Sequence, residues 1–201
     1  MKTVHLILWG AVAVGLILFL WLNIFQDASH LIDDGSSQNT TTSFIPTFSL
    51  TDHRGNVVTE QTYRNKWLLV FFGFTNCPDI CPTTLADLAS VMEQLGADAK
   101  AIVPLFISID PDRDRLETMA QYVSAFHPAI VGLTGTETLI TAAAGSFKVY
   151  FEKQPQESAP DGYTMGHTSA VYLISPAGEF VRTYSYGTQP DEITADLQQR
   201  L

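Results

Sequence analysis

The chain has 201 residues, which is enough for one domain of ordinary size and an additional segment. Its formal net charge is −10, with 21 acidic residues against 11 basic ones, and the sequence contains no basic cluster. This charge argues against nucleic acid as a partner and favours a well-solvated domain, leaving a basic protein or a cationic ligand open.

The additional segment is an apolar stretch at residues 4–25. Only His5, Gly10, Gly15 and Asn23 interrupt its apolar side chains. As a helix it would be about 33 Å long, enough to cross a bilayer core of about 30 Å. A cleaved secretory signal is the alternative, but the run is longer than a typical signal core and no clear cleavage site follows it. We therefore predict one N-terminal transmembrane helix.

The flanking charges predict the orientation of this helix. Lys2 precedes it, whereas Asp27 is the first of several aspartates that follow. Because positive charge stays on the cytoplasmic side, the rest of the chain is expected in a bacterial periplasm or in the mitochondrial intermembrane space. Residues 26–43 are polar and aperiodic, which is typical of a flexible tether. Residues 44–201 then form the folded domain.

Hydrophobic periodicity and turn residues predict the elements of that domain. In chain order these are a β-hairpin at 44–58, a strand at 67–74, a helix at 83–95, a strand at 102–109, a helix at 116–126, a strand at 130–133, a helix at 137–149, a long surface loop at 152–166, a second hairpin from strands at 168–174 and 180–186, and a helix at 191–201. Asp114 is expected to cap the helix at 116–126. The alternation predicts an α/β domain with a mixed sheet flanked by helices, in a thioredoxin-like arrangement.

The strand at 67–74 leads into the two cysteines of the chain. Its continuous apolar, aromatic and β-branched residues predict a strand buried on both faces. Cys77 and Cys81 follow in the turn before the next helix, where open α/β sheets place their functional sites. Pro82 suits a first helical turn, so the cysteines are expected at a helix N-terminus, which favours a thiolate.

Two cysteines four residues apart allow three interpretations. A structural disulfide would suit an oxidising compartment, but its short loop would contribute little stabilisation. A reactive dithiol would cycle by thiol–disulfide exchange. A metal site is the third interpretation. Structural zinc requires four ligands, whereas Cu(I) accepts two thiolates with an imidazole, so a copper site needs one histidine.

Five histidines are candidates for that ligand. His5 lies in the predicted anchor and His30 in the tether, while His53 and His127 are expected at the surface of turns. His167 directly precedes a predicted strand whose start lies beside the cysteine helix in a thioredoxin-like sheet. From the pattern alone, a lone histidine at a strand start is more often a structural group than a ligand, so both roles stay open.

Four segments of the chain, in order, resemble the signature segments of the Sco/SenC family of membrane-anchored copper proteins. They are F-F-G-F-T-N-C-P-D-I-C-P at 71–82, I-S-I-D-P-D-R-D at 107–114, G-L-T-G-T at 132–136 and Y-T-M-G-H-T at 163–168. The resemblance spans about residues 44–186. It implies a thioredoxin-like fold and copper bound by Cys77, Cys81 and His167. It also implies that the protein helps to assemble the copper site of cytochrome c oxidase.

Several residues near Cys77, Cys81 and His167 are expected to have different roles. The family commonly has an acidic residue where this chain has Gly166, so we expect an effect on copper affinity and partner contact. Met165 is expected to fill space, and Asp79 to stabilise the helix N-terminus or to contact a partner. The turn after the strand at 102–109 carries three aspartates, which we expect to form a capped turn rather than a hard-cation site: Asp110, Asp112 and Asp114.

Two functions follow as hypotheses. The first is a copper chaperone that delivers copper to the oxidase copper-site subunit, with another periplasmic copper chaperone as a further partner. The alternative is a thiol–disulfide oxidoreductase that reduces the copper-ligand cysteines of the oxidase or of another extracytoplasmic partner. The spacing of Cys77 and Cys81 differs from the C-x-x-C of typical redox proteins, which argues against the alternative.

Overall fold

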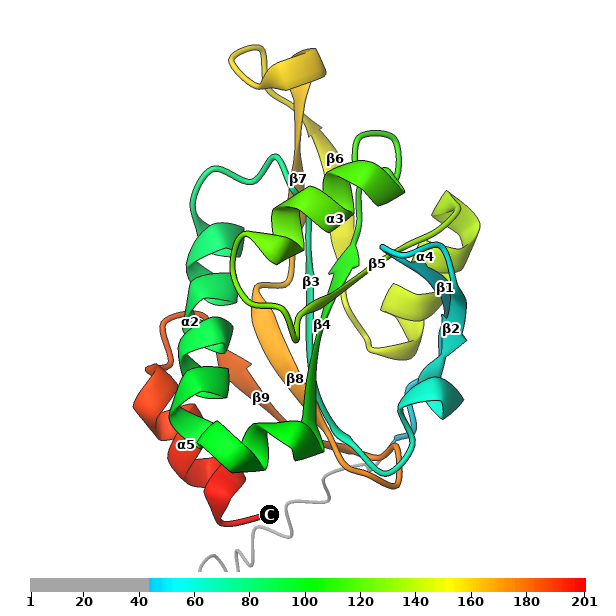
Figure 1. Ribbon diagram of the computed structural model, residues 1–201. Helices are drawn as coiled ribbons and strands as arrows, with labels where there is room; N and C mark the ends of the chain where they lie inside the picture. Colours follow the sequence, from blue (N-terminus) through cyan, green and yellow to red (C-terminus); the bar gives the residue numbers. More distant parts are fainter. Residues whose placement is uncertain (1–43) are drawn as a thin grey trace, which may run out of the picture. The chain divides into compact units, whose positions relative to one another are not determined.

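The computed structural model describes residues 44–201 of the chain (Figure 1). The predicted anchor at 4–25 and the predicted tether at 26–43 lie outside the described residues. Within the described part of the chain, no helix combines the length and the hydropathy that a membrane span requires.

A seven-stranded mixed sheet forms the centre of the domain, in the order β2-β1-β5-β4-β3-β8-β9. Its strands are β1 (Ser49–Asp52), β2 (Val57–Thr59), β3 (Trp67–Gly73), β4 (Ile102–Ser108), β5 (Val131–Thr134), β8 (Ala170–Ile174) and β9 (Phe180–Ser185). Strands β3, β4 and β5 run parallel, whereas β8 pairs with β3 and β9 in antiparallel fashion. The predicted mixed sheet is therefore confirmed.

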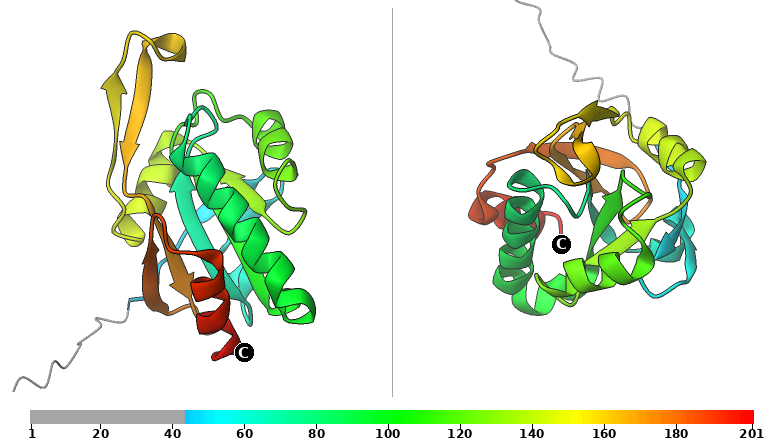
Figure 2. Two further views of the ribbon diagram at one scale, coloured as in Figure 1. Left: turned by 90° about the vertical axis from the view of Figure 1, so that its left-hand side faces the viewer. Right: turned by 90° about the horizontal axis from the view of Figure 1, so that it is seen from above.

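Within residues 44–201, four α-helices connect and cover these strands. They are α2 (Ile80–Leu95), α3 (Leu116–Ser124), α4 (Glu137–Ser146) and α5 (Pro190–Gln198), with short 3-10 turns at Glu60–Tyr63 and Gly96–Ala101. Figure 2 shows α2 and α4 on opposite sides of the sheet, with α5 beside α2. The predicted flanking helices are confirmed, and α2 begins three residues before the predicted start at 83, so that Cys81 lies in its first turn.

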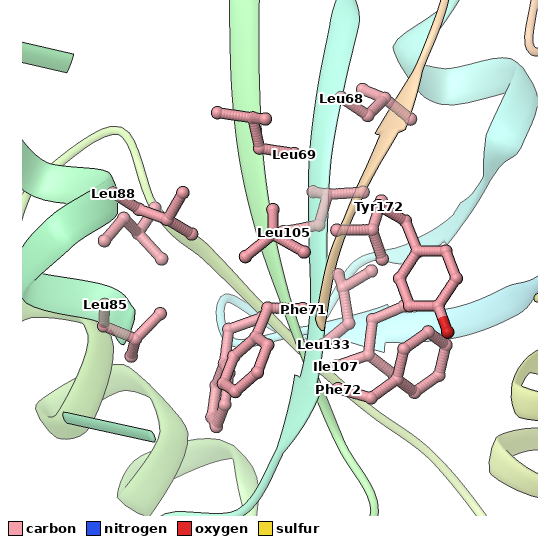
Figure 3. Packing of buried hydrophobic residues seen from close by; sticks show 14 of the residues in the cluster. Leu68, Leu69, Phe71, Phe72, Leu85, Leu88, Leu105, Ile107, Leu133 and Tyr172 are labelled. Atoms are coloured by element: carbon pink, nitrogen blue, oxygen red, sulfur yellow. The ribbon is translucent and has the colours of Figure 1, made fainter. Parts of the chain in front are cut away.

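Strand β3 is central because its side chains pack on both faces of the sheet. Phe71 points to the side on which α2 places Leu85, and Phe72 points to the opposite side, towards Tyr172 (Figure 3). The ring centroid of Phe72 lies 5.3 Å from that of Phe147, directly after α4. Each such fully buried aromatic side chain stabilises the fold by about 1.5–3 kcal/mol. These contacts fix the carboxyl end of β3, from which the cysteine loop departs.

The prediction of a surface loop at 152–166 is wrong. This segment forms a second, two-stranded antiparallel sheet from β6 (Phe151–Pro155) and β7 (Tyr163–His167), closed by a 3-10 turn at Pro160–Gly162. The hairpin extends beyond the end of the main sheet (Figure 1). Four of the five residues of β6 are exposed, so the segment lacks the alternation that identifies a half-buried strand.

The predicted capping role of Asp114 is also wrong. Helix α3 begins after Arg115, with no side-chain capping bond. Asp114 is instead fully buried, where it accepts hydrogen bonds from the Ser108 hydroxyl at 2.6 Å and from the Thr75 backbone N–H at 3.0 Å. The spacing of Asp114 and Glu117 fits a helix cap, but spacing alone does not show that the Asp114 carboxylate points into the protein.

Candidate metal centre

The two cysteines lie at the junction of β3 and α2. The Cys77 N–H donates to the carbonyl of Phe74 at 3.3 Å, and the Cys81 N–H donates to the Cys77 sulfur at 3.4 Å. Cys81 is fully buried, whereas Cys77 is partly exposed, and both are free thiols. The first turn of α2 therefore presents one accessible sulfur and one covered sulfur.

The lack of a side chain at Gly73 makes room for the covered sulfur. A Cβ atom at position 73 would lie only 2.8 Å from the Cys81 Sγ and 2.8 Å from the ring of Phe106. Both neighbours are fully buried, so neither has free space into which to move. Glycine is thus required at this position by the close approach of the α2 start to the end of β3.

We expect Gly73→Ala to destabilise the domain by about 1–3 kcal/mol, the usual cost of overpacking a filled core. Urea unfolding of the variant measures this loss. The matched control is Gly145→Ala in α4, where no atom lies within 4 Å of the new Cβ. Because alanine favours a helix over glycine, the control should be stabilised by up to about 1 kcal/mol. Equal stability of Gly73→Ala and the natural protein would contradict the close approach.

The two cysteines differ in pKa because the Cys81 thiol donates a hydrogen bond to the Cys77 sulfur. The pKa of Cys77 is lowered from 9.0 to about 4, chiefly by the hydrogen bond from the Cys81 thiol. The backbone N–H groups of Asp79 and Cys81 lower it further, against the opposing effect of burial. The pKa of Cys81 is raised by the same hydrogen bond and by burial. At neutral pH the pair therefore holds a Cys77 thiolate and a Cys81 thiol.

His167 lies next to this pair, at the end of β7. Its Nε2 is 3.8 Å from the Cys81 Sγ, and its Nδ1 is 3.1 Å from the backbone carbonyl of Thr168. Since a carbonyl only accepts, this contact places the proton on Nδ1 and leaves the lone pair on Nε2. The rings of Phe71 and Phe74 lie edge-on, with centroids 5.9 and 6.1 Å from that of His167. The histidine is thus oriented by one hydrogen bond and two rings.

This arrangement suits a soft metal ion. Thiolate and imidazole ligands about 2.3 and 2.0 Å from one ion, at an angle near 120°, are separated by about 3.7 Å. The distance of 3.8 Å from the Cys81 Sγ to the His167 Nε2 is close to that value. Two sulfurs and one imidazole match the donors that Cu(I) prefers. Among residues 44–201, however, no three ligand side chains are already grouped at metal-binding distances.

A cavity of about 360 Å³ gives access to the centre and is lined by Cys77, His167 and Phe74, among others. A larger cavity, of about 440 Å³, lies between α4, β6 and the turn after β4, and neither cysteine nor His167 lines it. Met165 lines both cavities and is almost fully buried, in agreement with its expected space-filling role. The cavity beside Cys77, rather than the larger one, is therefore the candidate site.

The other residues singled out in the sequence take various places. His53 and His127 accept backbone N–H groups at 3.1 Å, so both have structural roles, whereas His5 and His30 lie outside the described residues. Asp79 precedes α2 without a side-chain capping bond. A Cβ at Gly166 would lie 2.6 Å from the end of the flexible Gln154 side chain, so a larger residue at 166 requires that side chain to move.

Sequence reasoning missed the groups that hold this centre together. Gly73 and the ring of Phe74 lie in the predicted strand, but only the fold shows that they contact Cys81 and His167. Arg113 lies between Asp112 and Asp114, and an arginine between aspartates is a signal of an ion pair.

Comparison with known proteins places the chain among proteins of known fold. The mitochondrial SCO2 homolog of Bos taurus is 42% identical over 156 residues, which make up 77% of this chain and 58% of that relative. The match thus spans little more than half the length of the relative. The structure of Bradyrhizobium japonicum ScoI with copper bound is 39% identical, with a TM-score of 0.73, and the match covers 79% of this chain and 99% of that one.

A more distant structure carries further information. BsSco is 26% identical, with a TM-score of 0.62, over 78% of this chain and 92% of its own. It is described as a member of the Sco family of cytochrome c oxidase assembly proteins with a disulfide switch. The family model described as SCO1/SenC matches residues 36–201, which is most of the chain. This protein therefore belongs to the SCO1/SenC family.

Proposed function

We propose that this protein binds a copper ion through Cys77, Cys81 and His167 and delivers it to the copper site of cytochrome c oxidase during assembly. The observation that carries the proposal is the 3.8 Å distance between the Cys81 sulfur and the unprotonated ring nitrogen of His167. The copper bound to the related ScoI and the oxidase-assembly role given for BsSco support it.

The site prepares two of its three donors before the ion arrives. Cys77 is already a thiolate at neutral pH, and His167 already directs its Nε2 lone pair towards the sulfurs. Cys81 must still lose its proton, which is released when copper replaces the hydrogen bond between the sulfurs. Because Cys77 is partly exposed, an acceptor thiolate can reach the ion from its side, and ligands are then exchanged one at a time.

The location follows from the sequence. We place residues 4–25 in a membrane as a single anchor and residues 26–43 in the tether, with the thioredoxin-like domain in a periplasm or an intermembrane space. The relatives named as mitochondrial proteins support the second of these two compartments. The partners are then the copper-site subunit of the oxidase and a second copper chaperone that loads the site. Gly166 is expected to weaken copper affinity and partner contact.

Anaerobic copper titration of the full chain tests the proposal. The natural protein should bind one equivalent, with the absorption of thiolate-to-metal charge transfer, and the variant that combines Cys77→Ala with Cys81→Ala should show neither. The control is Ser90→Ala in α2, because Ser90 is half-buried and does not line the cavity beside Cys77. Copper retained by the double cysteine variant would remove the sulfurs from the site.

One observation favours a second function, that of a thiol–disulfide oxidoreductase. A thiolate with a pKa of about 4, partly exposed and hydrogen-bonded to a second thiol, is the arrangement that attacks a partner disulfide. In that reaction Cys77 forms a mixed disulfide and Cys81 then displaces the partner thiol, so two electrons pass to the partner and the protein becomes a disulfide. Copper binding requires the imidazole of His167, whereas thiol–disulfide exchange depends on the two sulfurs.

A further inference from the structure

The turn between β4 and α3 contains unusually buried charge. The side chain of Asp110 is 1% exposed, that of Arg113 is 9% exposed, and Asp114 is fully buried. A solvated turn would expose such groups, and burying them costs free energy unless each charge is paired and hydrogen-bonded.

Arg113 holds the β6–β7 hairpin. Its Nε forms an ion pair with Asp110, and its Nη1 donates to the carbonyls of Pro160 and Tyr163 at 3.1 and 3.2 Å. The guanidinium carbon lies 3.8 Å from the centroid of the Tyr163 ring. The Tyr163 hydroxyl in turn donates to Asp110 at 2.9 Å. The turn thus grips the start of β7, the strand that ends in His167.

Asp114 connects the same turn to the cysteine loop. Its carboxylate accepts from both the backbone N–H and the hydroxyl of Thr75, two residues before Cys77. Arg113 also lies 5.8 Å from the ring centroid of Phe74, which packs edge-on against His167. One short turn therefore contacts both segments that carry the donor atoms, although these are far apart in the sequence.

We propose that Arg113 is a positioning residue, which fixes the β6–β7 hairpin so that His167 stays within reach of the sulfurs. This inference rests on the proposed copper function for its affinity measurement, but its structural part does not. A planar guanidinium with several donors can bind one carboxylate and two carbonyls while stacking on an aromatic ring. A lysine at 113 retains the charge but loses the planar set of donors.

The chain offers a matched control for this contact. Lys153 of β6 also joins the hairpin to the turn, through an ion pair with Asp112 at 3.0 Å and a cation–π contact with Tyr163 at 4.0 Å. Both partners of that ion pair are at least half exposed, and exposed pairs contribute little. We therefore expect Lys153→Met to leave the hairpin in place.

The experiment compares the natural full chain, Arg113→Lys and Lys153→Met by backbone hydrogen exchange without metal and by anaerobic copper titration. In Arg113→Lys, exchange at β6 and β7 should rise about tenfold or more while β3 and β4 stay protected, and copper affinity should fall about 10–100-fold, as for other groups that orient a ligand. Lys153→Met should match the natural protein. Tyr163→Phe, which keeps the ring and loses the hydroxyl, should give a smaller effect of the same kind.

Unchanged exchange in the hairpin of Arg113→Lys would overturn the proposal. So would a rise spread evenly over β3 and β4, because that result shows a general loss of stability. If the hairpin loosens but copper affinity is unchanged, Arg113 holds the hairpin but does not position His167, and the proposal fails. If the natural protein itself binds no copper, the proposed function fails, and the exchange measurement still decides whether Arg113 holds the hairpin.

Discussion

His167→Ala is expected to lower the copper affinity of the full chain by more than about 100-fold, since losing even a group that only orients a ligand costs 10–100-fold. The physical reason is the position of its Nε2, 3.8 Å from the Cys81 sulfur, with the ring proton fixed on the opposite nitrogen by Thr168. Without this donor, two sulfurs remain, and the charge-transfer absorption should shift or disappear. Anaerobic competition with a copper chelator of known affinity measures the loss.

The matched control is His127→Ala. His127 also forms a hydrogen bond through its Nδ1, which in this case accepts from the N–H of Ala129 at 3.1 Å, but it does not line the cavity beside Cys77. Its replacement removes a local hydrogen bond, with an expected cost of about 1 kcal/mol, and should leave copper affinity unchanged. If both histidine variants bound copper as tightly as the natural protein, His167 would have no place in the site.

The variant His167→Ala also distinguishes the copper chaperone from the thiol–disulfide oxidoreductase. Thiol–disulfide exchange depends on the two sulfurs, and the largest influence on the Cys77 thiolate is the Cys81 thiol rather than the imidazole. A copper chaperone would therefore lose its function in His167→Ala, whereas an oxidoreductase would retain most of its exchange rate. Measuring both activities on one preparation shows which function depends on the imidazole.

The sequence was sufficient where local pattern and burial agree. The continuous apolar run of β3, rich in aromatic and β-branched residues, predicts a strand buried on both faces, and Phe71 and Phe72 are both fully buried. The same run located the cysteines at its carboxyl end. The helices were also predictable, because apolar residues at helical spacing mark the buried side of α2.

The sequence was insufficient where long-range contacts decide. The hairpin of β6 and β7 is stabilised by its own backbone pairing and by Arg113, a residue 50 positions before Tyr163, so no local pattern reveals it. The proximity of Cys81 and His167, 86 residues apart, could be inferred only from the predicted thioredoxin-like topology and from resemblance to a family, because no local pattern shows it. For Asp114 a local pattern was present but misleading, because the spacing matches a helix cap whereas the carboxylate is buried against Ser108.

A second large effect is expected in the reaction of Cys77 with iodoacetamide in the metal-free protein. A thiolate with a pKa of about 4 stays ionised as pH falls, whereas an ordinary thiol with a pKa of 9.0 becomes protonated. At pH 5 the ionised fraction of Cys77 exceeds that of an ordinary thiol by about 10⁴-fold. Lower basicity reduces thiolate reactivity by about 100–300-fold over five pKa units, which leaves a net gain of about 30–90-fold.

The rate should therefore stay nearly constant from pH 8 to about pH 5 and fall only as the pH approaches the pKa of about 4. Cys81→Ala removes the hydrogen bond that contributes most to this low pKa, so the fall should begin at a higher pH, towards the ordinary value. Cys81→Ser, which retains a donor, should lie between the two. A Cys77 rate that drops tenfold per pH unit below pH 8 would show an ordinary thiol. Such a result would also remove the prepared thiolate on which the oxidoreductase hypothesis depends, whereas copper binding would then release a proton from each cysteine.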